Sequence, residues 1–143
     1  MKISTKGRYA LRLMLDLALC DPGKPRRIKD ISESQKISDK YLEQIISVLN
    51  KAGYVNSVRG PQGGYMLTKS PEQYTVGMIL RLTEGSLAPV ACVEDDVPCE
   101  RADGCVTVLL WKKLNEAING VVDNITLADL VNWQLEKNGE YSI

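Results

Sequence analysis

The chain has 143 residues, 44% of them apolar, and its 18 Lys and Arg balance 18 Asp and Glu, so that the formal net charge is zero. This length suits one compact domain with a modest core, or a small domain that carries an oligomerisation arm. No apolar run approaches the ~20 residues that cross a bilayer, and charged residues interrupt the N-terminal apolar stretch, unlike the core of a signal peptide. We therefore expect a cytoplasmic protein without a membrane segment.

The balanced total conceals an uneven distribution of charge along the chain. Residues 1–75 carry 13 Lys and Arg against 7 Asp and Glu, whereas residues 76–143 carry 5 against 11. A basic segment attracts a polyanion and an acidic segment repels it. Any nucleic acid is therefore expected to bind the N-terminal half.

Apolar spacing predicts helices in the N-terminal half. Residues 4–20 are expected to form a helix that is buried on most sides, with Arg8, Arg12 and Asp16 facing solvent. A proline- and glycine-containing stretch ends this helix, and a short helix over residues 28–34 follows.

The next helix is predicted to begin after Ser38, a good capping residue, and to end at Gly53. Its apolar residues recur at steps of three and four, which predicts one buried face: Leu42, Ile45, Ile46, Leu49 and Ala52. After Gly53 the period changes, and residues 54–58 and 65–68 are predicted to pair as a β-hairpin. The tip of the hairpin holds three glycines, a proline and Arg59.

The C-terminal half is predicted to contain two more capped helices and a long amphipathic one. Thr75 precedes a helix over residues 76–85, and Thr126 precedes one over residues 127–137. Between them, an irregular cysteine-rich loop leads to a helix whose apolar residues alternate at steps of three and four. This stripe is a candidate dimer interface and comprises Trp111, Leu114, Ile118, Val121 and Ile125.

Three helices followed by a hairpin are typical of a winged helix-turn-helix. A major groove about 12 Å wide accepts one helix, and a tip without bulky side chains can approach phosphates or the minor groove. The expected fold is thus mainly α with a small β-hairpin wing, divided into a DNA-binding domain (1–84), a cysteine-rich sensor loop (85–106), and a dimerisation helix with a C-terminal helix (107–143). The candidate DNA-binding residues are Ser38, Lys40, Tyr41, Glu43, Gln44, Ser47, Arg59 and Gly60.

A polar helix face alone is more often a solvated surface than a DNA reader. Here the order of the elements, the basic charge and the glycine-rich hairpin together favour the DNA reader. Glu43 is unusual in such a face, because a carboxylate is repelled by phosphates unless it accepts a hydrogen bond from a cytosine amino group.

Three of the four cysteines fall within fourteen residues, as Cys92, Cys99 and Cys105. In a reducing compartment, clustered thiols indicate a metal site or redox sensing more often than structural disulfides. The spacing lacks the CxxC turns of structural zinc sites, which favours an iron–sulfur cluster; zinc and bare-thiol redox sensing stay open. Cys20 lies in an apolar helix and is expected to be a small buried residue.

Several motifs resemble the IscR/NsrR/CymR family of winged-helix transcriptional regulators: MKISTKGRYAL (1–11), YLEQ (41–44), VRGPQGGY (58–65) and NITLADLV (124–131). The resemblance covers essentially the whole chain. It implies a bacterial repressor that binds palindromic operators as a homodimer, with Arg59 in the minor groove and the dimer interface on the helix after the cysteine loop. It also implies that the three cysteines bind an iron–sulfur cluster, 2Fe–2S in preference to 4Fe–4S.

The chain departs from this family in the fourth cluster ligand. Val108 stands where the iron–sulfur cluster regulator has a histidine, and Arg8 stands where the nitric oxide sensor has an aspartate. The remaining candidates are a residue of the partner subunit, a small exogenous ligand, or a loop carboxylate among Glu94, Asp95, Asp96, Glu100 and Asp103.

Three other functions predict different features. The chain has no histidine and no phosphate-binding loop, so that we expect no enzyme. A metal-free repressor, controlled by thiol oxidation or by a partner protein as in the cysteine-metabolism branch of the family, is one alternative. A zinc-stabilised interaction module is the other, and it predicts no salt-dependent binding to duplex DNA.

Overall fold

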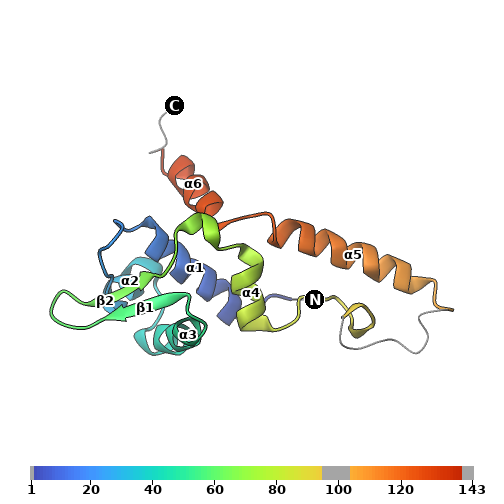
Figure 1. Ribbon diagram of the computed structural model, residues 1–143, viewed down its shortest axis with the longest axis horizontal. Coiled ribbons are helices and arrows are strands. Elements are labelled where there is room, and N and C mark those ends of the chain that lie inside the picture. The colour runs from blue at the N-terminus through green and yellow to red at the C-terminus, as the bar shows by residue number, and fades with distance from the viewer. Residues whose placement is uncertain (1, 95–103, 140–143) are drawn as a thin grey trace.

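The computed structural model describes residues 2–94 and 104–139, and it is mainly helical with one two-stranded sheet in these ranges (Figure 1). The elements are α1 (Thr5–Leu19), α2 (Ile28–Gln35), α3 (Asp39–Lys51), β1 (Val55–Val58), β2 (Gly64–Leu67), η1 (Pro71–Gln73), α4 (Val76–Glu84), η2 (Ala91–Val93), α5 (Thr107–Val122) and α6 (Leu127–Lys137). This order confirms the predicted helices followed by a hairpin wing, and α5 projects from the remaining elements as an arm.

Hydroxyl side chains begin four of the helices. Ser4, Ser38, Thr75 and Thr126 each accept a hydrogen bond from the backbone N–H three residues later. Such caps satisfy backbone donors that have no partner within the helix. The last three caps confirm the helix starts predicted from the sequence.

The core forms around α1, where α2, α3, α4 and α6 contact it. Its fully buried side chains include Leu13 and Met14 of α1, Leu42, Ile45 and Leu49 of α3, and Leu127 of α6. The predicted apolar face of α3 is thus confirmed, except at its end, because Ala52 is exposed as the C-cap residue.

The expected exposure of two residues in α1 is wrong. Asp16 is 4% exposed, and its carboxylate pairs with Arg26 and accepts a hydrogen bond of 3.1 Å from the Gln35 side-chain amide. A buried carboxylate is tolerated when it is paired in this way. Leu19, by contrast, is 41% exposed at the end of the helix, whereas the apolar residues of this helix were expected to be buried.

One buried hydroxyl group connects the hairpin to the segment that follows it. Tyr74 is fully buried, and its hydroxyl donates to the Tyr54 carbonyl at 2.8 Å while it accepts from the backbone N–H groups of Thr68 (3.2 Å) and Lys69 (3.1 Å). The rings of Tyr54 and Tyr74 meet edge to face, with centroids 5.7 Å apart. The base of the wing is therefore held by a fully satisfied polar group.

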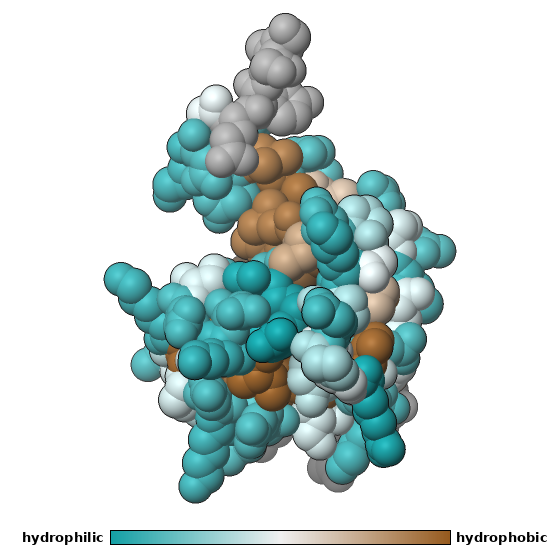
Figure 2. Space-filling view, turned by 90° about the vertical axis from the view of Figure 1, so that its left-hand side faces the viewer, coloured by the Kyte–Doolittle hydropathy of each residue, from teal (hydrophilic) through white to brown (hydrophobic). Residues whose placement is uncertain are grey.

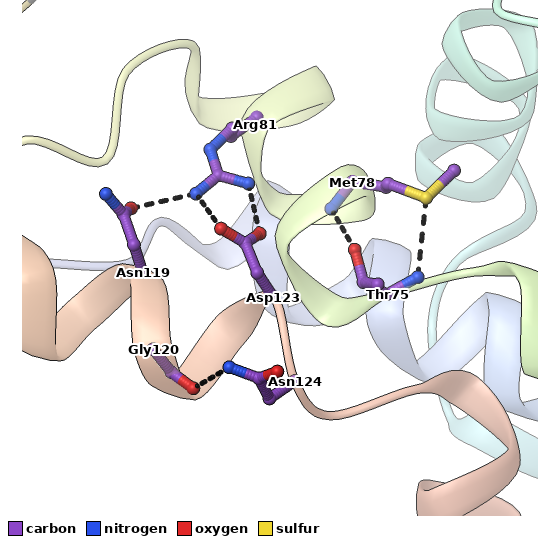
Figure 3. Close-up of polar contacts among 7 residues, drawn as sticks. All are labelled: Thr75, Met78, Arg81, Asn119, Gly120, Asp123 and Asn124. Carbon is purple, nitrogen blue, oxygen red and sulfur yellow. Dashed lines mark hydrogen bonds and ion pairs between the residues drawn. The ribbon is translucent and has the colours of Figure 1, made fainter.

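The end of α5 and the start of α6 return to the N-terminal elements. The Val76 N–H donates to the Ile125 carbonyl at 2.9 Å, and the Leu127 N–H donates to the Tyr74 carbonyl at 2.8 Å. Arg81 of α4 also binds Asp123 at the end of α5 (Figure 3). No helix in the described ranges is long and apolar enough to cross a membrane.

Candidate nucleic-acid interface and cysteine segment

The polar face of α3 is open to solvent. The exposed residues of α3 and its N-cap are Ser38, Asp39, Lys40, Glu43, Gln44, Ser47, Asn50 and Lys51. The Ser38 oxygen accepts the cap hydrogen bond from the Tyr41 N–H at 3.2 Å, which leaves its O–H free to donate outward. Viewed from the side opposite α5, the surface below α6 is mostly hydrophilic, with apolar side chains gathered where α6 meets the other elements (Figure 2).

Tyr41 differs from the other candidates on α3, because it is half-buried. Its ring meets the Tyr9 ring edge to face, with centroids 5.5 Å apart, and the Arg12 guanidinium lies 5.3 Å from the centroid of Tyr9. Arg12 in turn donates to the Gln35 side chain at 3.1 Å, at the end of α2. Arg12 thus braces α2 against α1, a role that the sequence pattern did not indicate.

Arg59 and Gly60 lie in the exposed turn between β1 and β2. The strands pair antiparallel from Val55 opposite Leu67 to Val58 opposite Gly64. Gly60 has a φ of 105°, a region that favours glycine. A Cβ at Gly63 would lie 2.1 Å from the Val58 carbonyl oxygen, so that the turn requires glycine there too.

The three predicted cluster ligands are only partly placed. Cys92 is half-buried in η2, which packs on α5, and Cys105 directly precedes the first turn of α5; Cys99 lies outside the described residues. Within the described ranges, no group of three cysteine or carboxylate residues is close enough to hold a metal ion. The three-cysteine site therefore stays a prediction.

The start of α5 favours the charged form of the Cys105 thiol. Its sulfur lies 3.0 Å from the Thr107 hydroxyl, and this hydrogen bond, with a smaller contribution from the Val108 backbone N–H, lowers the pKa of Cys105. Burial has the opposite effect on Cys20, whose pKa it raises. The Cys20 thiol donates to the Asp16 carbonyl at 3.2 Å. A thiolate is the form that binds metals and reacts with oxidants.

The structure describes both residues that replace the fourth cluster ligand of the family. Val108 is 4% exposed in the first turn of α5, and Arg8 is exposed on α1. Among the loop carboxylates only Glu94 is described; it lines a cavity of about 300 Å³ that Cys92 and Glu116 also line. Asp95, Asp96, Glu100 and Asp103 lie outside the described residues.

The predicted dimer stripe lies on the projecting helix and the turn after it. Leu114 and Val121 are 40% and 57% exposed, whereas Trp111, Ile118 and Ile125 are half-buried. Leu109 and Leu110, which are not part of the stripe, are also more than half exposed. The arm therefore presents a broader apolar surface than the predicted stripe.

The basic half of the chain contains a helix pair followed by a β-hairpin wing with a glycine-rich turn. These features define a winged-helix transcriptional regulator that binds DNA. The chain belongs to the Rrf2 family, described as an iron-dependent transcriptional regulator, whose profile matches residues 3–133. This membership confirms the resemblance seen in the sequence motifs.

Two relatives show the range of the similarity. The transcriptional regulator IscR of Serratia proteamaculans is 46% identical over 134 residues, which cover 94% of this chain and 81% of the relative. The transcriptional regulator CymR of Bacillus subtilis is 41% identical over 133 residues, or 93% of this chain and 91% of the relative. Both are regulators rather than enzymes, in agreement with the expectation from the sequence.

Solved structures give the same picture. CymR of B. subtilis, described as the global cysteine regulator of that organism, superposes with a TM-score of 0.79 at 41% identity. The match covers 93% of this chain and 98% of the CymR chain. IscR of T. potens superposes with a TM-score of 0.77 at 39% identity, and the match covers 100% of this chain and 93% of the IscR chain.

Proposed function

We propose that the protein is a homodimeric repressor that binds palindromic operator DNA in the cytoplasm and senses iron–sulfur or redox status through Cys92, Cys99 and Cys105. The single observation that carries the DNA-reading part is the exposed polar face of α3, a helix that packs on β1 of the hairpin whose glycine turn holds Arg59. Lys40, Gln44 and Arg59 supply donors to bases and phosphates.

The dimer part of the proposal rests on α5. A helix that leaves Leu109, Leu110 and Val121 more than half exposed to water is unfavourable unless another surface covers these side chains. A second copy packed along α5 covers both arms at once. A twofold dimer then presents two α3 helices to half-sites about one DNA turn apart, near 34 Å.

The sensing part rests on the chemistry of the donors. Soft thiolates suit an iron–sulfur cluster, and the lowered pKa of Cys105 favours its thiolate. Cys92, Cys99 and Cys105 would hold the cluster, with Glu94 as the described carboxylate available for the fourth position. When bound, the cluster supplies a redox- and oxygen-sensitive centre, and one weak ligand would make it labile.

The path from the thiols to the DNA-reading elements runs along α5. The segment with Cys92 packs on α5, Cys105 lies two residues before that helix, and the far end of α5 is bound to α4 through Asp123 and Arg81. We propose that ligation of the cysteines reorders the segment before α5 and thereby shifts α5 relative to the winged helix.

Anaerobic purification followed by absorption spectroscopy and iron and sulfide analysis tests the sensing part. We expect a coloured protein whose operator affinity changes on oxidation, and Cys92→Ala should abolish both properties. Cys20→Ala, at a cysteine outside the triad, is the matched control and should retain both. A colourless protein with full, redox-independent operator affinity would overturn the sensing proposal but not the DNA-reading one.

A metal-free repressor of the CymR kind is the second candidate. The observation that favours it is the absence of the family histidine at position 108, together with 41% identity to CymR. On this alternative the anaerobic protein contains no iron, and Cys92→Ala leaves operator affinity unchanged in the absence of a partner protein or oxidant.

A further inference from the structure

Two adjacent arginines before α2 contact the wing at separate points. The backbone of Arg26 pairs with that of Tyr65 in β2, through an N–H to O bond of 2.9 Å and a return bond of 2.8 Å. The Arg26 guanidinium points the other way and pairs with the buried Asp16 of α1. The base of the wing is thereby joined to α1.

Gly64 makes this junction tight. A Cβ at this position would lie 2.5 Å from the carbonyl carbon and oxygen of Arg26, and the φ of Gly64 is 151°. Only glycine lets the two backbones approach so closely without strain. The first point of contact is therefore fixed by backbone geometry.

Arg27 makes the second point of contact, further out along the wing. It is the N-cap residue of α2, and its Nη2 donates to the Pro61 carbonyl at 3.0 Å. Pro61 lies in the turn between the strands, where the Gly63 N–H donates to the Gly60 carbonyl at 2.9 Å. Strand pairing ends at Val58 and Gly64, so that this turn extends beyond the sheet ladder.

A glycine-rich turn beyond a ladder has many accessible backbone conformations, and a bond from outside the turn restricts them. We propose that Arg27 is a positioning residue that fixes the wing tip, and with it Arg59, relative to the helix-turn-helix. The proposal rests on the proposed role of Arg59 in DNA reading. Because Arg27 is exposed, the remaining N–H donors of its guanidinium stay available to a phosphate.

Hydrogen exchange in the DNA-free protein tests the positioning step by itself. Arg27→Ala should accelerate exchange of the Gly63 amide by about 3- to 10-fold, because the turn loses its external hydrogen bond. Arg27→Lys keeps a charged donor, so that the exchange rate of the Gly63 amide should stay near that of the parent protein. Lys24→Ala, which removes an exposed cation three residues earlier, is the matched control. Equal exchange in Arg27→Ala and the parent would overturn the proposal.

A double-mutant cycle with Arg59 tests the functional step. Arg27→Ala should weaken operator binding by about 3- to 10-fold in the parent but by less than about 2-fold in Arg59→Ala, because the residue to be positioned is then gone. Equal factors in both backgrounds would show that Arg27 contributes its charge alone, and would overturn positioning. If Arg59→Ala itself leaves affinity unchanged, the proposed role of the wing fails, while the exchange result still decides whether Arg27 orders the turn.

Discussion

Arg81 of α4 and Asp123 at the end of α5 form a two-point ion pair, with Nη1 2.5 Å from Oδ1 and Nη2 3.0 Å from Oδ2. Nη2 of Arg81 also donates to the Asn119 side chain at 2.9 Å, so that one guanidinium binds two residues one turn apart on α5 (Figure 3). Paired N–H···O bonds of this kind fix direction as well as distance. This contact joins the arm to the winged helix, in addition to the backbone bond between Val76 and Ile125.

Asp123→Ala should lower the free energy of unfolding by about 0.5–1 kcal/mol, the range of a partly exposed ion pair with good geometry. Urea unfolding of Asp123→Ala, Arg81→Ala and the double variant measures the coupling between the two residues. Glu116→Ala removes an exposed carboxylate of α5 that is not the ion-pair partner of Arg81 and is the control. Strict additivity of the two single changes would contradict a direct interaction.

Tyr74→Phe should destabilise the protein by about 1–3 kcal/mol, because three buried hydrogen bonds to backbone groups are lost and the Thr68 N–H and Tyr54 carbonyl keep only their mutual bond of 3.3 Å. Thermal or urea unfolding gives the value. Tyr54→Phe is the matched control, since Tyr54 is half-buried and takes part through its carbonyl rather than its hydroxyl. A smaller loss for Tyr74→Phe than for Tyr54→Phe would argue against the hydroxyl as a junction.

Gly64→Ala should cost about 1–3 kcal/mol of stability or separate the wing from Arg26, because the added Cβ meets the backbone of Arg26. We expect weaker duplex binding with a folded core, measured by unfolding and by operator titration. Gly104→Ala is the control, since a Cβ there has no neighbour within 4 Å and its φ is not positive. Equal behaviour of the two variants would contradict the tight junction.

Glu43→Ala should relax base preference at one position of each half-site, because a carboxylate on the exposed face of α3 discriminates by accepting from a cytosine amino group. Selection of binding sites from a random library measures the preference. Lys51→Ala, at the far end of the same helix, serves as the control for loss of a charge alone. An unchanged preference would remove Glu43 from the set of base-reading residues.

The thiols of Cys105 and Cys20 should differ in their pH dependence. The Thr107 hydroxyl lowers the pKa of Cys105 and burial raises that of Cys20, so that at a given pH near neutrality a larger fraction of Cys105 is thiolate. Alkylation of the reduced, metal-free protein should therefore label Cys105 before Cys20. Thr107→Val should move the midpoint for Cys105 to higher pH and leave Cys20 unchanged; an unmoved midpoint would contradict the role of the hydroxyl.

The helices and their starts could be predicted because the signals are local. A cap needs only a hydroxyl side chain and the N–H three residues on, and at Ser38, Thr75 and Thr126 both lie within one turn of sequence. The buried face of α3 follows in the same way from its own spacing. Leu42, Ile45, Ile46 and Leu49 were all placed correctly.

Contacts that depend on tertiary approach could not be predicted from spacing. Asp16 was expected to face solvent because it is charged, although it lies three residues after the buried Leu13. Its partner, Arg26, lies in a loop, and the position of a loop residue cannot be predicted from helical periodicity. The same holds for the bond from Arg27 to Pro61. In the candidate site, the exposed positions on α3 follow from the helical spacing of its apolar residues. The grouping of the cysteines depends on a segment whose sequence has no regular apolar spacing, so that it could not be predicted in this way.

The arm α5 contains 16 residues, which at a rise of 1.5 Å per residue gives a rod about 24 Å long. Its last turn is bound by Arg81, whereas Cys105 lies two residues before its first residue. By simple trigonometry, a tilt of about 10° around the held end displaces the first turn by about 4 Å. On the proposed sensing role, a change of a few ångströms among the thiols would be converted into a small rotation of α5, repeated in the second copy of the proposed dimer.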